Sequence, residues 1–459
     1  MKKNNIWILF EERPKVEVIE KILNIYLEKN KSKFVNNGLR IIPEINNNEF
    51  KFLYKIENFK IEGINNIFLL LVSGYSSFVD FLLFRSENKP GENFQLKNCL
   101  YAIEETKTDS SESRNTAAGQ RGTKFLFVEY YGKLFNQNLD KVMLYNAPET
   151  QNKKEASSVK FIKKCLKTTG VKFYGDYSDL YSQFNEVDEV TTEKNSIKKP
   201  PKGNTPIRIK KENNKIKISG ILSKPTNKGN IGHDPNQGQL ITISNTLRKL
   251  GWNKKIEITK HKVSQSYVNR VKGNKFLYAM RILKIDLEKI DTPIINLPKH
   301  YWHYEKSGEK VATILLHTIC NYLNLESIYE NHAGSERGYF YSKNRDGIVV
   351  NKKYRGRNIN LPDYVFADVD NKQIIVCEGE MFKNYNKGVK QIEGFDIFIR
   401  QYIQKYYSNY NIIKSLVLSD GKGTELKDNV IFQLNSNGRI GIGKKLPQKI
   451  VNFLNEYNN

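Results

Sequence analysis

The stretch LYAIEETK, residues 100–107, joins an apolar run to two acids and a lysine. An aliphatic and aromatic run of this length is typical of a strand buried in a sheet. Side chains alternate between the two faces of a strand, so Glu105 and Lys107 are expected to share one face. The stretch therefore predicts a strand over 100–106 that ends in a charged pair.

The surrounding sequence extends an α/β pattern. Apolar runs predict strands at residues 7–10, 67–72, 79–84, 124–131 and 142–145. Apolar residues that recur at helical spacing after Pro14 predict an amphipathic helix, and a second helix is expected to begin within 113–122. We expect this first α/β unit to end near residue 188.

Asp80, in the expected strand 79–84, brings a second carboxylate toward Glu105. Two carboxylates from adjacent strands suit Mg²⁺, a hard cation that takes a few carboxylates, waters and phosphate oxygens. Lys107 beside them is suited to orient or deprotonate a water molecule and to stabilise charge on phosphorus. With Asp80 and Glu105 as metal ligands, these residues supply the parts needed to hydrolyse a phosphodiester. The alternative is a surface hairpin whose charges are solvated.

A second acidic constellation lies in the last third of the chain. Asp363 is expected near the start of one strand, and Glu378 and Glu380 share a face at the end of the next. Asp363 and Glu378 are the expected metal ligands, and Glu380 stands where the first constellation has a lysine. Glu380 itself is suited to bind the metal or to orient the water. Alternatively, Lys383 or Lys387 from the following segment supplies the missing lysine. The competing interpretation is a turn-flanking acid and acids at a helix N-terminus.

The net charge points to a polyanionic partner. The chain has 459 residues, with 74 Lys and Arg against 49 Asp and Glu, a formal charge of +25. Residues 194–228 carry eleven basic residues and one acid, and residues 245–289 carry twelve and three. Lys and Arg that neutralise nucleic-acid phosphates release condensed counterions. The alternative explanation is the Lys- and Asn-rich composition of a protein from an AT-rich genome.

The middle of the chain is basic and rich in turns. Pro and Gly punctuate residues 189–240, which predicts a linker or a DNA-facing flap. Residues 207–209 and 215–218 alternate Ile with Lys or Arg, as an exposed hairpin would. Helices and a short strand are expected over 243–283. The candidates for phosphate contacts, or alternatively for a solvated helix face, are Arg248, Lys249, Lys254, Lys255, Lys260 and Arg270.

Candidates for base contacts follow the first constellation. They are Arg114, Asn115, Gln120 and Arg121. Arg can read guanine, and Asn or Gln can read adenine, through paired hydrogen bonds. The alternative for each is a phosphate contact or simple solvation.

Three parts are expected along the chain: a nuclease-like α/β domain at 1–188, a basic DNA-binding region at 189–306 and a second nuclease-like domain at 307–459. The third part is expected to contain a helix at 310–323 and a long helix at 389–407. The first and third parts share an order of elements.

An Asp, a spacer and Glu-x-Lys on the next strand, followed by a helix, resemble the core pattern of PD-(D/E)XK nucleases, type II restriction endonucleases among them. The resemblance at Asp80, Glu105 and Lys107 covers roughly residues 60–145. It includes EETKTDSSESRN, residues 104–115, which looks like restriction enzymes that place a specificity helix after the catalytic strand, although Val79 stands in place of the family's proline.

The resemblance at Asp363, Glu378 and Glu380 covers roughly residues 307–420. It keeps the family's Pro-Asp, as Pro362-Asp363, and has Glu in place of Lys.

The resemblance implies an α/β (α+β) fold, with a mixed sheet flanked by helices, in two such units beside a basic helical and β middle region. It implies Mg²⁺ as cofactor and sequence-specific hydrolysis of double-stranded DNA by metal-activated water, as in restriction–modification. Two arrangements are open: both units cut, one strand each, or one unit cuts while the other has become a recognition lobe. The chain is expected to act as a monomer with two sites or as a homodimer. The alternatives are a non-catalytic DNA-binding protein on a decayed nuclease fold and a structure-specific defence or transposition nuclease.

Several protein classes are disfavoured. Four widely spaced cysteines without a CxxC pair argue against a disulfide scaffold and a Cys-rich zinc site, and they fit a reducing cytoplasm. The longest apolar run, residues 67–72, is too short to span a bilayer, and no secretory signal is expected. We therefore expect a cytoplasmic protein without membrane association.

Overall fold

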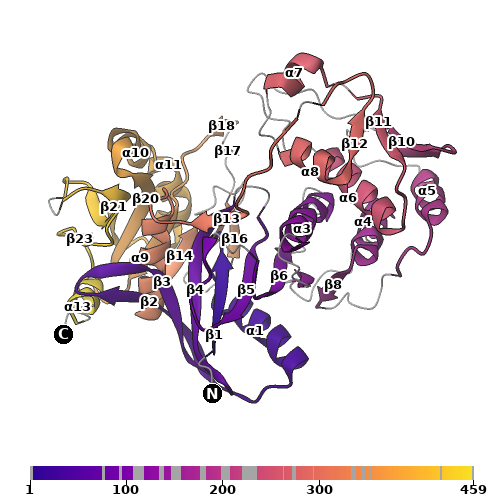
Figure 1. Cartoon of the computed structure of the whole chain (residues 1–459). Helices are drawn as coiled ribbons and strands as arrows, with labels where there is room; N and C mark the ends of the chain where they lie inside the picture. The colour runs from indigo at the N-terminus through magenta and orange to yellow at the C-terminus, as the bar shows by residue number, and fades with distance from the viewer. Residues whose placement is uncertain are drawn as a thin grey trace. The chain divides into compact units, whose positions relative to one another are not determined.

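The computed structural model describes residues 4–74, 78–92, 96–106, 118–133, 139–145, 157–175, 182–197, 207–219, 235–261, 263–270, 275–292, 294–331, 338–342, 347–350, 353–354, 356–423 and 426–456. The chain divides into two compact units (Figure 1). Unit 1 joins residues 1–72 to 304–459, and unit 2 is residues 73–303. This differs from the expected order of three consecutive parts, because the first 72 residues pack with the C-terminal segment.

The N-terminal part of unit 1 contains four strands of a mixed sheet. Its elements are β1 (Asn4–Phe10), α1 (Val16–Asn30), β2 (Phe34–Asn46), β3 (Glu49–Ile61) and β4 (Ile64–Gly74). The strand order is β2-β3-β4-β1, with β1 parallel to β4. β2 and β3 form a hairpin that the sequence did not reveal. Asn47 and Asn48 at its turn both have positive φ, the conformation that tight hairpin turns require.

The C-terminal part of unit 1 is an eight-stranded mixed sheet. Its strands are β14 (Glu326–Glu330), β15 (Gly338–Tyr341), β16 (Gly347–Val350), β19 (Tyr364–Asp368), β20 (Gln373–Met381), β21 (Asn411–Gly421), β22 (Val430–Asn435) and β23 (Ile440–Ile442). The order is β16-β15-β14-β19-β20-β21-β22-β23. β19 and β20 are antiparallel, whereas β20 and β21 are parallel. The strands expected at 362–366 and 373–377 are thus present.

Helices cover both faces of this sheet. They are α9 (Val311–Tyr322), α10 (Tyr385–Glu393), α11 (Asp396–Phe398), the π-helical turn Ile399–Ile403, α12 (Gln404–Tyr406) and α13 (Gln448–Glu456). Ile374 and Val376 of β20 pack in one apolar cluster with α10 to α12. Gly379, which faces the other way, lies against Thr313 of α9. By alternation, Glu378 and Glu380 lie on the α10 face of the sheet.

Unit 2 contains four neighbouring strands of a mixed sheet, with helices between them. Its elements are β5 (Phe81–Ser86), β6 (Cys99–Thr106), α3 (Ala118–Lys133), β7 (Asp140–Tyr145), α4 (Ser157–Thr168), β8 (Val171–Tyr174) and α5 (Val187–Ser196). The order is β5-β6-β7-β8, with β5 antiparallel to β6 and the others parallel. Residues 124–131, expected as a strand, lie in α3.

The basic middle region is folded within unit 2. Its elements are β9 (Arg208–Lys211), β10 (Lys215–Ser219), α6 (Pro235–Lys249), β11 (Lys255–Thr259), α7 (Gln265–Arg270), α8 (Lys275–Leu283) and β12 (Ile285–Leu287), and β13 (Trp302–Tyr304) follows where the chain returns to unit 1. The hairpin predicted from alternating Ile and Lys is confirmed as β9 and β10. The hairpin buries Ile209, Ile216 and Ile218. It forms one edge of a four-stranded sheet, in the order β12-β11-β10-β9, and is not a linker.

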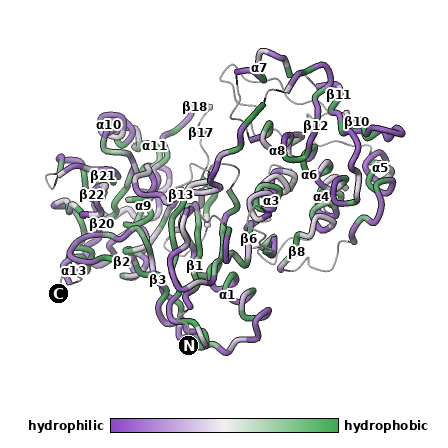
Figure 2. The backbone as a smooth tube through the Cα atoms, viewed as in Figure 1, coloured by the Kyte–Doolittle hydropathy of each residue, from purple (hydrophilic) through white to green (hydrophobic). Residues whose placement is uncertain are grey.

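The sheets carry the apolar residues, and the helices and turns carry much of the polar sequence (Figure 2). The fold is therefore mixed α/β, as expected. Among the described residues, no helix is long and apolar enough to cross a bilayer. All four cysteines are buried, and none of them forms a disulfide.

Candidate functional site

In unit 2, two carboxylates and a lysine meet where β5 begins and β6 ends. Lys124 of α3 lies 2.7 and 2.8 Å from the two carboxylate oxygens of Glu104 and 3.2 Å from Oδ1 of Asp80. The backbone N–H of Asp80 donates to Glu104, and that of Glu105 donates to Oδ2 of Asp80 at 2.8 Å. Arg121 of α3 lies 3.7 Å from Glu104.

Burial and charge shape this cluster together. Burial raises the pKa of Glu104 to about 7, and the neighbouring Asp80 carboxylate adds to the rise. Burial alone would lower the pKa of Lys124, but the carboxylates of Asp80 and Glu104 outweigh it, so the pKa is raised. The lysine therefore stays charged between the two acids.

The acid that meets Asp80 is Glu104, one residue before the expected Glu105. Glu105 contributes its backbone N–H, while its side chain alternates to the other face of β6. Lys107, Arg114 and Asn115 lie outside the described residues. Lys124 was missed because residues 124–131 read as a strand; on a helix, it is one turn from Arg121 and points toward the same acid.

In unit 1, Asp363 immediately precedes β19 and Glu378 and Glu380 lie near the end of β20. The N–H of Gly379 donates to Oδ2 of Asp363 at 2.9 Å. Glu380 is fully buried and pairs with Lys387 of α10. Lys387 also lies 3.8 Å from Glu309, which precedes α9. Of the two lysines considered from sequence, Lys387 is thus the one that reaches the acids.

Gln391 of α10 holds one oxygen of Glu378. Its amide nitrogen donates to Glu378 Oε1 at 2.6 Å. Glu378 is 5% exposed, and its other oxygen, Oε2, is buried with no hydrogen-bond partner in the described part of the chain. Buried polar atoms are nearly always satisfied, so an unpaired carboxylate oxygen marks a place for an added donor or cation.

The unit 1 acids carry an excess of negative charge. Burial raises the pKa of Glu378 to about 9, and Asp363, Glu380 and Glu309 add to the rise. Burial likewise raises the pKa of Asp363 to about 7, with Glu309 and Glu380 adding to it. The four carboxylates have one lysine, Lys387, between them, so a bound cation would relieve their repulsion.

The two clusters occupy the same register in their sheets. Phe81 pairs with Ile103 in unit 2, and Tyr364 pairs with Cys377 in unit 1. In each pair, the residue before the first strand is Asp, and the residue after its partner is Glu. The next N–H, from Glu105 or Gly379, donates to the Asp. Asp80 and Glu104 therefore correspond to Asp363 and Glu378.

The acids fit a partly hydrated Mg²⁺ better than a closed protein cage. No group of three or more His, Cys, Asp or Glu residues in the described ranges is arranged to hold a metal. Mg²⁺ binds proteins through one or two carboxylates and keeps several waters. Asp363 and the unpaired Oε2 of Glu378 would supply those carboxylates.

Most of the basic residues proposed for DNA contact have partners within unit 2. Arg248 donates to four backbone carbonyls, those of Trp252, Leu283, Lys284 and Lys254, so it holds α6 and α8 together and is not available as a phosphate clamp. Lys249 pairs with Glu129, Lys255 pairs with Glu257, and Lys254 donates to the carbonyl of Asn213.

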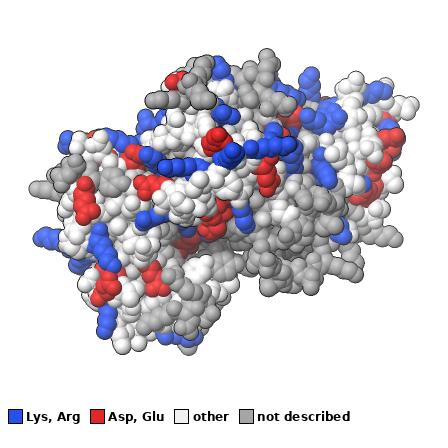
Figure 3. All heavy atoms as spheres, turned by 90° about the horizontal axis from the view of Figure 1, so that it is seen from below, with Lys and Arg blue, Asp and Glu red and all other residues white. Residues whose placement is uncertain are grey.

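Lys260 and Arg270 are exposed, and Gln120 is half-buried in the first turn of α3. On the face drawn in Figure 3, basic and acidic side chains lie among one another.

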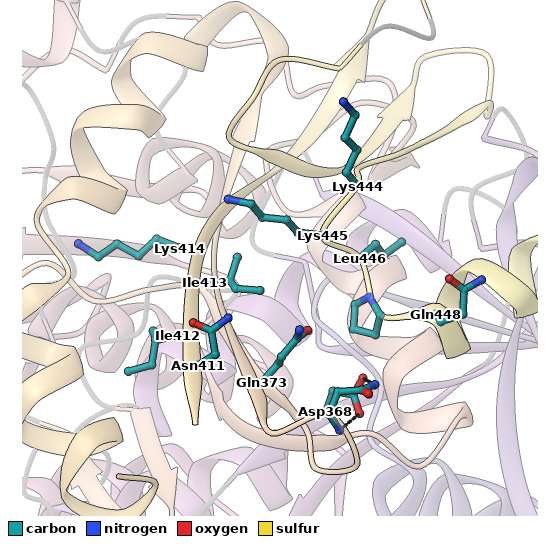
Figure 4. A pocket seen from close by; sticks show the side chains of 12 residues that line it. Asp368, Gln373, Asn411, Ile412, Ile413, Lys414, Lys444, Lys445, Leu446 and Gln448 are labelled. Carbon is teal, nitrogen blue, oxygen red and sulfur yellow. Dashed lines mark hydrogen bonds between the residues drawn. The ribbon is translucent and has the colours of Figure 1, made fainter. Parts of the chain in front are cut away.

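A pocket of about 500 Å³ lies in unit 1, away from the acids. It is lined by the starts of β20 and β21, Gln373 and Asn411, whereas Glu378 and Glu380 lie at the other end of β20. Figure 4 shows Lys414, Lys444 and Lys445 around the pocket, with Asp368 at a distance from these three lysines. Lys414 is paired with Asp396, and the chemistry of this pocket is separate from that of the acidic cluster.

No protein-family model, curated protein or solved structure matches the chain.

Proposed function

We propose that the protein is a Mg²⁺-dependent, sequence-specific endonuclease of double-stranded DNA, of the type II restriction kind, with its cutting site in unit 1. The observation that carries the proposal is the buried, unpaired Oε2 of Glu378 beside Asp363. The repeated register supports it, because an Asp and a Glu stand at the same paired positions in two sheets.

Asp363 and Glu378 would hold the ion, which supplies a Lewis acid at the phosphate and lowers the pKa of a bound water. The Gly379 N–H fixes the Asp363 carboxylate, and Gln391 fixes that of Glu378. Glu380 is buried, but the side chain of its partner Lys387 is 58% exposed. That ammonium can lie against a scissile phosphate while Glu380 orients it.

The charge of the chain favours a polyanionic substrate. A net +25 raises the association rate with DNA and makes binding fall with salt. Lys260 and Arg270, which are exposed, remain candidates for phosphate contacts.

Plasmid cleavage tests the proposal. The full chain is incubated with supercoiled plasmid and Mg²⁺, with EDTA in a parallel reaction. We expect discrete fragments with Mg²⁺ only, and loss of at least about 100-fold in rate for Asp363→Asn and Glu378→Gln, as for removal of other metal or charge-stabilising groups. Asp370→Asn is the matched control, because Asp370 is an exposed residue of the same β19–β20 hairpin, paired with Lys449.

A second candidate is a DNA-binding protein without nuclease activity. The closed ion cluster of Asp80, Glu104 and Lys124 favours it, because all three charges already have partners. It predicts salt-dependent retardation of DNA and an unchanged plasmid with Mg²⁺, and that pair of results would overturn the nuclease proposal.

A further inference from the structure

The Lys124 ammonium occupies the position between the acids of unit 2. Three carboxylate oxygens, two from Glu104 and one from Asp80, lie 2.7 to 3.2 Å from its nitrogen. The lysine enters from α3, the helix that follows the acidic strand. A cation is thus already built into this cluster as part of the chain.

The equivalent lysine of unit 1 is arranged differently. Lys387 pairs with Glu380 and Glu309, at the outer side of the cluster. Asp363 and Glu378, the residues that correspond to Asp80 and Glu104, accept bonds from Gly379 and Gln391, and neither has a lysine within ion-pair distance in the described chain.

The charges of the two clusters differ accordingly. When ionised, Asp80 and Glu104 face two cations, Lys124 and Arg121, and their charges balance. In unit 1, Lys387 is the one lysine of the described chain that pairs with the four acids, so that with all four ionised an excess of three negative charges would remain. A divalent cation would neutralise much of the excess in unit 1, whereas in unit 2 it would have to displace Lys124.

We infer that Lys124 takes the place of a divalent cation in unit 2, so that of the two clusters only the one in unit 1 binds metal. The consequence for cleavage rests on the proposed function: each chain cuts one strand, and a double-strand break requires a second copy of the chain. Unit 2 is then a nuclease-like half whose ion position is permanently filled.

Metal binding without DNA tests this inference directly. Free Mn²⁺ is measured by electron paramagnetic resonance with the full chain at pH 8.5. We expect one bound ion for the wild type, none for Asp363→Asn or Glu378→Gln, and one for Asp80→Asn. Lys124→Ala is expected to gain a second ion, because the oxygens of Asp80 and Glu104 are released.

Two results overturn the inference: loss of an ion in Asp80→Asn, or a wild type that binds no ion or binds two. Circular dichroism checks folding, and if Lys124→Ala fails to fold, the comparison of Asp80→Asn with Asp363→Asn still decides. A chain that binds one ion in unit 1 but leaves plasmid intact keeps this inference and loses the proposed activity. A chain that cuts plasmid, but loses its ion in Asp80→Asn, keeps the proposed activity and loses this inference.

Plasmid products test the consequence for the second copy. If each chain cuts one strand, nicked circles accumulate before linear DNA, and the ratio of linear to nicked product rises with protein concentration. A ratio independent of concentration, with linear DNA formed at once, contradicts one cut per chain.

Discussion

Replacing Lys124 by methionine removes the cation shared by Asp80 and Glu104 and keeps most of the side chain's volume. Breaking a buried ion pair from one side costs about 3–5 kcal/mol, because a charge is left without a partner. Here Glu104 is 5% exposed, but Asp80 is 31% exposed and Lys124 is 26% exposed, so water relieves part of the loss. We expect Lys124→Met to lower the free energy of unfolding by roughly 2–3 kcal/mol.

Urea unfolding in EDTA at pH 7.5, followed by circular dichroism, measures this loss. The matched variant is Glu104→Gln with Lys124→Met, in which the buried acid is neutral, and it should recover at least half of the loss. If the Lys124 ammonium fills a cation position, its removal leaves that position open, so without EDTA Mn²⁺ at 100 times its Kd should raise the free energy of unfolding of Lys124→Met by about 2.7 kcal/mol. A loss below about 0.5 kcal/mol, or no recovery in the double variant, would show that Lys124 does not neutralise Glu104.

Three further changes test the packing and charge of the two units. Without divalent ions, the free energy of unfolding of the wild type should fall as pH rises from 5 to 9, because the raised pKa of Glu378, about 9, means that the folded state holds a proton which the unfolded state has lost. The slope approaches at most about 1.4 kcal/mol per pH unit. Urea unfolding of Glu378→Gln should show a flatter pH dependence, and a slope equal to that of the wild type would contradict the raised pKa of Glu378. In Gly379→Ala, a Cβ would lie 2.9 Å from Thr313 Oγ1 and 3.1 Å from Asp363 Oδ2, so the affinity for metal should fall. Thr313→Ala in the same chain should restore the affinity. An unchanged affinity in Gly379→Ala would show that metal binding does not need Asp363 in its present position. In Gly238→Ala, a Cβ would meet the Gln120 nitrogen at 2.5 Å, where α3 and α6 cross, and we expect thermal unfolding to show a loss of about 1–3 kcal/mol; an unchanged midpoint would mean that the crossing tolerates a side chain.

Sequence periodicity recovered the elements whose pattern is local. The strand over 100–106, the β19–β20 hairpin, α9 and the β9–β10 hairpin all follow alternation or helical spacing. It failed at 124–131, where bulky aromatic residues favour a strand but the close approach of Gly119 and Gly122 to α6 favours a helix. Tertiary packing decided that segment, and local propensity could not.

The acidic site was predicted to within one residue in unit 2. Glu104 and Glu105 are adjacent, and alternation alone does not say which of them faces the helix. The pairing of Phe81 with Ile103 makes that choice, and these two residues lie 22 positions apart in sequence. In unit 1 the alternating pair Glu378 and Glu380 left no such ambiguity. Gln391 comes from α10 and Glu309 from the turn before α9, and neither carries a sequence signal of its own.

The two-part composition of unit 1 has a consequence for synthesis. Residues 1–72 leave the ribosome before unit 2, yet the segment that completes their unit is made after all of unit 2. At ~5–20 residues per second, the early strands wait for tens of seconds without their partners. The apolar side chains of β2 and β3 that are buried in the folded protein, Ile42 and Tyr54 among them, are therefore exposed in the nascent chain during that time.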